Sequence, residues 1–368
     1  MDKIEELHRK LQRVRVWMHD QGVGGLILRR RPNFAWITCG GQSHVNTAAD
    51  VGTATVLITD DRLVLVANNI EMERLAAEQV AGLPFDREDF PWHDATQQAR
   101  LIQALTRGLR LAADTADHEV AADDAAKAMR ASLLPPEIDR MRELGRVTTQ
   151  IIEEVCRRIE PGWTEYRVAA ELLSAATAQA ARIPVCLVAA DQRIMRYRHP
   201  VPTPSVIRQR AMVVVCMERH GLVCSATRLV SFAPLDDELR RRHRAVCEID
   251  AHAISATREG RSFRDIFAAI TAAYAKHGFP DEWHHHHQGG CTGYQPRDTI
   301  ATADSSTVVR SDQAFAWNPS VAGTKSEDTV LITGQGWTWI TAPGRDWPVL
   351  EIHCDGHRWR RADILVRD

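Results

Sequence analysis

Residues 282–298 read EWHHHHQGGCTGYQPRD, in which four consecutive histidines at 284–287 precede two glycines. Imidazole is a common metal ligand and titrates nearest pH 7, so the run indicates metal binding or proton transfer. A purification tag does not explain it, because tags sit at chain termini. In an extended strand only alternate side chains share a face, so we expect at most two of the four imidazoles to reach one site.

The length and composition indicate an ordinary globular protein of two domains or one large one. The chain has 368 residues, 44% hydrophobic and 26% charged, with a formal net charge of -2. This charge balance favours neither nucleic acid nor an anionic membrane as a partner. Met1 is followed by a charged amphipathic segment, and no apolar run approaches the length of a membrane span. We therefore expect a cytoplasmic protein.

Eight cysteines are scattered along the chain without a Cys-x-x-Cys pair. This distribution is typical of reduced, mostly buried thiols. We expect neither a zinc ribbon nor a redox motif.

The first third of the chain predicts an α/β domain. Apolar residues at helical spacing predict a helix over 4–21 that ends at Gly22 and Gly24. Apolar runs predict strands at 25–28, 34–38, 53–59 and 62–66, the last two forming a hairpin, and helices are expected at 69–79 and 123–130. Pro135 and Pro136 then interrupt helical structure. We place the domain boundary there, giving domains 1–134 and 135–368.

The second domain predicts helices alternating with antiparallel strands. Helices are expected from 137 to a point before Pro161, at 164–181 with Thr164 as the N-cap, at 236–256 and at 263–277. Strands are expected at 211–216, 222–232, 314–317, 329–333 and 337–341. The order predicts an α+β domain whose sheet curves around a site.

Three features resemble the pita-bread superfamily of aminopeptidase P, prolidase, methionine aminopeptidase and the metal-free creatinase. They are Thr227-Arg228 after a strand, the glycine-bounded histidine run, and Ser326-Glu327-Asp328-Thr329 near the C-terminus. The resemblance covers essentially the whole chain. It implies an α+β protein, with a creatinase-like N-terminal α/β domain followed by a pita-bread domain with a curved antiparallel sheet.

The resemblance also locates the positions that hold two metal ions in the superfamily's metallopeptidases. Their two aspartates, histidine and two glutamates correspond here to Val214, Ser225, His286, Asn318 and Glu327. Only His286 and Glu327 match the ligand types. Bridging carboxylates are needed to offset the charge of two hard cations, so we expect no two-metal centre and no cofactor.

Two further residues match creatinase positions. His199, in Arg198-His199-Pro200, corresponds to the histidine that handles protons, although a surface imidazole would also suit such a loop. Arg297 corresponds to the arginine that grips a substrate carboxylate, although an internal ion pair with Asp298 or Glu327 would equally explain it.

Three functional interpretations follow. The first, which we favour, is a metal-independent hydrolase of a C–N bond in a small polar compound, with His199 as general acid/base. The expected catalytic residues are His199, His286 and Glu327, and the expected substrate-binding residues are Arg297, Asn318, His287, Tyr294 and Ser225. The second is an Xaa-Pro-type metallo-aminopeptidase in which the histidine run and Glu218 replace the lost ligands. The third is a non-catalytic binding protein, which predicts no solvent-shielded pocket around His199.

The expected partners are a small-molecule substrate and a second copy of the chain. Two-domain members of the superfamily usually form homodimers, and twofold dimers are the commonest assemblies.

Overall fold

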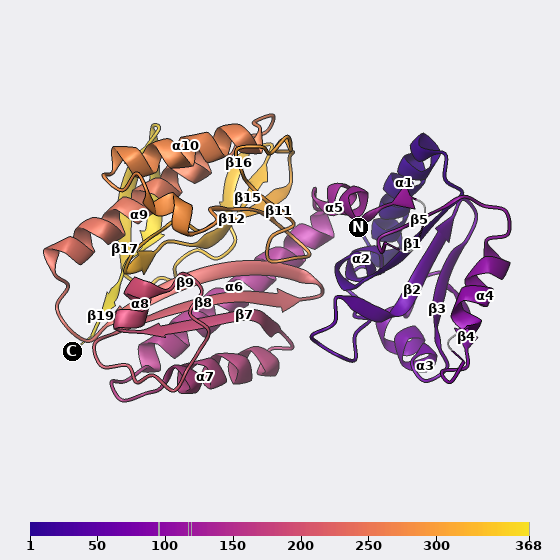
Figure 1. Cartoon of the computed structure of the whole chain (residues 1–368), viewed down its shortest axis with the longest axis horizontal. Helices are drawn as coiled ribbons and strands as arrows, with labels where there is room; N and C mark the ends of the chain where they lie inside the picture. The colour runs from indigo at the N-terminus through magenta and orange to yellow at the C-terminus, as the bar shows by residue number, and fades with distance from the viewer. Residues whose placement is uncertain (95, 117, 119, 368) are drawn as a thin grey trace. The chain divides into compact units, whose positions relative to one another are not determined.

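The computed structural model describes residues 1–94, 96–116, 118 and 120–367. The chain divides into two compact units (Figure 1). The first comprises Met1–Glu137 with His220–Leu222, and the second comprises Ile138–Arg219 with Val223–Asp368. Each unit has its own sheet and its own apolar core.

The first unit is built on a six-stranded mixed sheet of order β4-β3-β2-β1-β5-β6. Helix α1 (Lys3–Gln21) begins at Asp2, whose side chain accepts a hydrogen bond from the Glu5 N–H, and ends at Gly22 with φ 61°. The strands are β1 (Gly25–Arg30), β2 (Val51–Thr59), β3 (Leu63–Asn68), β4 (Asp86–Phe90), β5 (Leu111–Ala113) and β6 (Val120–Ala121). The β2–β3 pair is antiparallel, which confirms the expected hairpin.

The strand expected at 34–38 is wrong. This segment belongs to helix α2 (Arg31–Ile37), which has a proline in its first turn. All residues from 33 to 37 are buried, so the helix lacks the polar face that would have shown a helical period in the sequence. The remaining helical segments of this unit are α3 (Met72–Arg74), which continues into a π-helical turn at Leu75–Gln79, α4 (Gln97–Leu105) and α5 (Asp123–Arg130).

The second unit contains a nine-stranded, mainly antiparallel sheet. Seven strands follow the order β11-β10-β12-β15-β9-β8-β7, while β16 pairs with β15 and β19 pairs with β9. The strands are β7 (Arg182–Ala190), β8 (Arg210–Arg219), β9 (Leu222–Ser231), β10 (Gly289–Thr292), β11 (Thr299–Ile300), β12 (Gln313–Trp317), β15 (Asp328–Thr333), β16 (Gly336–Trp339) and β19 (Leu365–Val366). The sheet is curled, as the resemblance implied. Two small hairpins stand apart from it, β13 (Ser320–Val321) with β14 (Thr324–Lys325), and β17 (Val349–Cys354) with β18 (His357–Ala362).

Helices flank this sheet (Figure 1). Helix α6 (Pro135–Arg158) is followed by α7 (Glu165–Ala178), which contacts β7 and has the expected N-cap Thr164. Helix α8 (Gln192–Arg196) is short, and α9 (Asp237–Ala256) packs against α10 (Phe263–Lys276) and contacts β12 and β17. Among the described residues, no helix combines the length and apolarity needed to cross a membrane.

The histidine run is not an extended strand. Its first two members lie in a 3-10 turn, Glu282–His285, and β10 begins only at Gly289. His286 is extended between the two, so the alternation of a strand does not apply. Seven of the eight cysteines are buried, as expected, and Cys186 is half-buried.

Candidate active site

Strands β9 and β15 hold the acidic centre of the site. The Thr227 backbone N–H donates to the carbonyl of Glu327 at 3.0 Å, and the Thr227 hydroxyl donates to the Glu327 carboxylate at 2.8 Å. Side chains alternate along a strand, so the next residues, Arg228 and Asp328, meet on the opposite face, where they form an ion pair at 3.0 Å. Both pairs are buried, and together they fix the direction of the Glu327 side chain.

Two cations bind the Glu327 carboxylate. Lys325 Nζ lies 2.7 Å from Oε2, and Arg297 Nη2 lies 2.7 Å from Oε1. Burial alone would raise the pKa of the Glu327 carboxyl, but Lys325 and Arg297 outweigh it and lower the pKa to about 2. Glu327 is therefore a carboxylate at neutral pH.

Arg297 connects two positions of the expected site. Its Nη1 donates to the Ser225 hydroxyl at 3.2 Å, while Nη2 donates to Glu327. The Ser225 hydroxyl in turn donates to the Cys216 thiol at 3.3 Å. The internal ion pair with Glu327, weighed above as the alternative to substrate binding, is therefore formed.

His199, His286 and His287 gather in one cluster. His286 Nε2 lies 3.1 Å from His199 Nε2, and His286 Nδ1 lies 3.1 Å from the Ser320 hydroxyl. The His287 ring lies 4.8 Å from that of His286 and 5.6 Å from that of His199. The two members of the run that share a site are thus adjacent in sequence, not alternate.

Burial keeps this cluster neutral. It lowers the pKa of His199, and Lys325 and Arg297 lower it further against the opposing effect of Glu327. The pKa of His286 is strongly lowered by burial and then by Lys325. Burial and Arg297 lower the pKa of His287 to about 4. A neutral imidazole can accept a proton, so His199, the exposed member of the cluster, is available as a base near pH 7.

An ion pair ties the loop that carries His199 to the start of the histidine run. Arg198 pairs with Glu282, and the Ala322 backbone N–H donates to the same carboxylate at 3.3 Å. His284 does not join the cluster, because its ring stacks on Trp283 at 3.6 Å.

The remaining expected residues are placed as follows. Asn318 is buried, its backbone N–H donates to the Gln288 carbonyl at 3.1 Å, and its Oδ1 has no hydrogen-bond partner among the described residues. Tyr294 is buried, and its backbone N–H donates to Asp298 at 3.2 Å. Glu218 forms an ion pair with Arg182 across the β7–β8 pair.

Sequence reasoning missed Lys325 and Thr227 as partners of Glu327, and Ser320 as a partner of His286. A signal for Lys325 was present. Residues two apart in an extended segment share a face, and Lys325 lies two residues before Glu327. Ser320 is distant in sequence from His286, so no local pattern could have found it.

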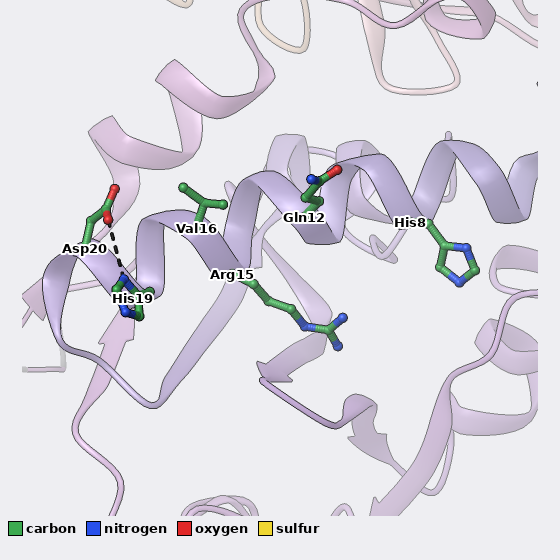
Figure 2. A pocket seen from close by; sticks show the side chains of 6 residues that line it. All are labelled: His8, Gln12, Arg15, Val16, His19 and Asp20. Atoms are coloured by element: carbon green, nitrogen blue, oxygen red, sulfur yellow. Dashed lines mark ion pairs between the residues drawn. The ribbon is translucent and has the colours of Figure 1, made fainter.

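A hollow elsewhere in the chain contains none of these residues. Figure 2 shows that its lining side chains all project from α1, with His19 and Asp20 paired at 3.6 Å. The lining consists of His8, Gln12, Arg15, Val16, His19 and Asp20. One face of one helix does not enclose a substrate, so we assign no site there.

Comparison with known proteins places the chain in a family. The model of metallopeptidase family M24 matches residues 139–334, more than half of the chain, and that of the creatinase/prolidase N-terminal domain matches residues 10–144. The chain belongs to metallopeptidase family M24. This membership confirms the pita-bread resemblance and supports a hydrolase of C–N bonds. No curated protein sequence matches the chain.

Solved structures agree with the M24 fold. An Xaa-Pro dipeptidase from Bacillus anthracis is 18% identical with a TM-score of 0.77, and the match covers 98% of this chain and 100% of that chain. Dipeptidase PepE from Mycobacterium ulcerans is 17% identical with a TM-score of 0.77, covering 99% of each chain. An X-Pro aminopeptidase from Thermotoga maritima is 16% identical with a TM-score of 0.75, covering 97% of this chain and 99% of that chain. Identities this low show the shared fold only.

The metal pair that the M24 name implies does not fit these side chains. Val214, whose side chain has no ligand atom, is buried in an apolar cluster with Leu187, Met212 and Leu229. Arg297 links the Ser225 and Glu327 positions with a guanidinium, which repels a metal ion. Lys325 occupies the other oxygen of Glu327.

A single transition metal is a different case. The ligand nitrogens of His199, His286 and His287 all lie within 4.8 Å of one another. Three imidazoles can hold one zinc ion. The 3.1 Å contact between His199 and His286 is equally a normal hydrogen bond, so the geometry supports both states.

Proposed function

We propose that this M24 chain is a metal-independent hydrolase that cleaves a C–N bond in a small polar, carboxylate-bearing substrate, with His199 as general acid/base. The observation that carries the proposal is the Arg297 guanidinium between Ser225 and Glu327. Together with Lys325, it supplies positive charge at family ligand positions. Side chains therefore supply the positive charge that bound metal ions would otherwise supply at these positions.

His286 orients the proposed base. When His199 Nε2 carries the proton, it donates to His286 Nε2, and His286 Nδ1–H donates to the Ser320 hydroxyl. The lone pair of His199 then lies on Nδ1, where it can take a proton from water and later deliver it to the leaving nitrogen. The strongly lowered pKa of His286 keeps that ring neutral and prevents it from holding the transferred proton. We therefore propose His286, expected above as a catalytic residue, as a positioning residue.

The charge of the site defines the substrate class. Lys325 and Arg297 carry two positive charges around the one negative charge of Glu327. The excess favours an anion, and a guanidinium binds carboxylates well. The Oδ1 of Asn318, which has no partner in the part of the chain that the structure describes, can accept a hydrogen bond from a substrate N–H. We assign His287, Tyr294 and Ser225 to substrate binding with Arg297 and Asn318.

The test uses protein dialysed against a chelator. It is assayed on carboxylate-bearing amides, cyclic amidines, creatine and X-Pro dipeptides, with and without added Mn, Co or Zn. We expect turnover of at least one compound without metal, and loss of that turnover in His199→Ala. Turnover that requires added metal, with two ions bound per chain, would refute the proposal.

Two other functions are each favoured by one observation. The His199, His286 and His287 cluster favours an Xaa-Pro-type metallo-aminopeptidase with rewired ligands, although Glu218, its other expected ligand, is already paired with Arg182. The exposure of His199 in the single chain favours a non-catalytic binding protein. The metal dependence of turnover identifies the first, and substrate binding that persists with no turnover under any condition identifies the second.

We further propose a cytoplasmic enzyme that acts on a small molecule as a homodimer. The small net charge favours neither nucleic acid nor an anionic membrane, which supports a small-molecule partner. His199 is exposed in the single chain, which supports a dimer in which the second chain covers His199.

A further inference from the structure

A second cluster of ligand-type side chains lies outside the candidate active site. His252 projects from α9, Cys354 is the last residue of β17, and Asp355 begins the turn to β18. His252 Nδ1 lies 3.1 Å from Cys354 Sγ, and Cys354 Sγ lies 3.5 Å from Asp355 Oδ2. The third side of this triangle, from His252 Nδ1 to Asp355 Oδ2, is 3.9 Å.

These separations suit one metal ion. The circle through three points so placed has a radius of about 2 Å, and bonds from zinc to nitrogen, oxygen and sulfur are about 2.0–2.3 Å long. An ion near the centre of the triangle, slightly out of its plane, therefore reaches all three atoms with little movement of the chain. A thiolate with an imidazole is a donor set that zinc prefers over magnesium or calcium.

We propose that His252, Cys354 and Asp355 bind a single zinc-type ion. The ligand atoms are Nδ1, Sγ and a carboxylate oxygen, and water completes the coordination on the side where Asp355 is exposed. Cys354 releases its thiol proton to solvent when the ion binds. His252 carries its ring proton on Nε2, so the exposed Lys276 side chain, now 3.4 Å from that nitrogen, turns away.

The site would add a link between α9 and a hairpin whose Ile352, Cys354 and Trp359 are buried in the core of this unit. Within the described part of the chain, strands β17 and β18 pair only with each other, and the hairpin packs on α9. Its β18 strand carries the buried Arg361, which pairs with Asp250 of α9 and, at 3.3 Å, with Asp328 beside Glu327. An ion shared by α9 and the hairpin would hold Arg361 in place, and through it the strand that presents Glu327. The proposed role is structural, separate from the hydrolytic chemistry.

The experiment titrates metal-free full-length protein with Co²⁺ and follows thiolate-to-cobalt charge-transfer absorption. We expect a band that saturates at one ion per chain and is lost in Cys354→Ser. Asp355→Ala removes an exposed side chain and should fold, so it tests the site independently, with an expected loss of about tenfold or more in affinity. Cys186→Ser, at a half-buried cysteine on β7, is the matched control and should keep the band.

Thermal unfolding gives a second readout. With one equivalent of Zn²⁺, the Tm of His287→Ala, in which the other histidine cluster is broken, should rise more than that of the double variant His287→Ala/Asp355→Ala, because an ion that binds only the folded chain stabilises it. No thiolate band in the wild type, or a band that survives Cys354→Ser, would overturn the proposal. Since hydrolysis is not measured, this outcome is separate from the failure of the proposed function. An ion bound by His252, Cys354 and Asp355 is not one of the two active-site ions whose presence would refute the proposed function. Asp355→Ala weakens binding at this site alone, so it distinguishes this ion from an active-site ion.

Discussion

His199 contacts His286 in the histidine cluster, whereas His285 lies outside that cluster, so alanine variants of the two residues test the proposed acid/base. His199→Ala removes the proposed acid/base, so kcat should fall by about 10²–10⁴-fold with little change in KM. His285→Ala is the matched control, because His285 lies in the 3-10 turn and outside the cluster. It should keep near-normal kcat. A near-normal kcat in His199→Ala would show that the proton is transferred elsewhere.

Arg297 tests substrate recognition. Its guanidinium would attract a substrate carboxylate in ground and transition states alike, so Arg297→Ala should mainly raise KM. The control is a second substrate in which the carboxylate is replaced by a neutral primary amide. Arg297→Ala should raise KM for the carboxylate substrate and leave KM for the amide nearly unchanged. An equal loss on both compounds would mean that Arg297 serves only to hold Glu327.

Lys325 should control the pH dependence of the reaction. The pKa of His199 lies below its ordinary value of 6.5 because of burial and then because of Lys325. A base acts only when neutral, so kcat/KM should fall as the pH drops below the pKa of His199. Lys325→Met removes a nearby cation and raises that pKa, so this acid limb should move to higher pH. Lys127→Met, in the other unit, should leave the limb in place, and an unmoved limb in Lys325→Met would contradict the assignment.

At the level of elements, sequence patterns predicted the long helices α1, α6, α7, α9 and α10 and most central strands. They missed the shorter helices α2 and α4 and two kinds of strand. Strand β7 contains Pro184, which argues against a central strand, yet β7 is the last strand in the sheet order, where proline is tolerated. The β17–β18 hairpin was missed because β18 is rich in arginine and histidine and, among the residues that the structure describes, pairs only with β17. The site residues came from the resemblance. Lys325 and Ser320 were left out because they act through contacts between segments.

Helix α6 provides a test of packing between elements. A methyl group on Gly145 would meet the backbone oxygen of Ile340, which follows β16 and cannot move like a side chain. Alanine is the better helix former, so propensity alone predicts that Gly145→Ala stabilises α6. We expect the opposite, a loss of about 1–3 kcal/mol in the free energy of unfolding, because overpacking outweighs propensity. Denaturant unfolding measures this loss of stability. Gly334→Ala is the control, because Gly334 has open space around it. Equal stability of the two variants would show that α6 shifts without cost.

At the level of the whole molecule, the single chain leaves its proposed base exposed. His199 lies on a loop near exposed apolar side chains that include Tyr197 and Val201, the latter 67% exposed. Proton transfer is favoured where water is excluded, and a large exposed apolar patch commonly marks an interface. A second copy of the chain would provide both the cover and the apolar contact.

We therefore predict a homodimer, with light scattering at micromolar concentration giving twice the chain mass of 41.3 kDa. Val201→Glu should shift the mass toward the monomer, because it places a charge in the apolar contact. Val308→Glu, at another exposed valine, is the control and should remain dimeric. If the partner covers His199, specific activity should fall on dilution at the concentration where the dimer dissociates, and Val201→Glu should be inactive while still folded. A monomer with full activity would show that one chain forms the complete site, with His199 working in contact with solvent.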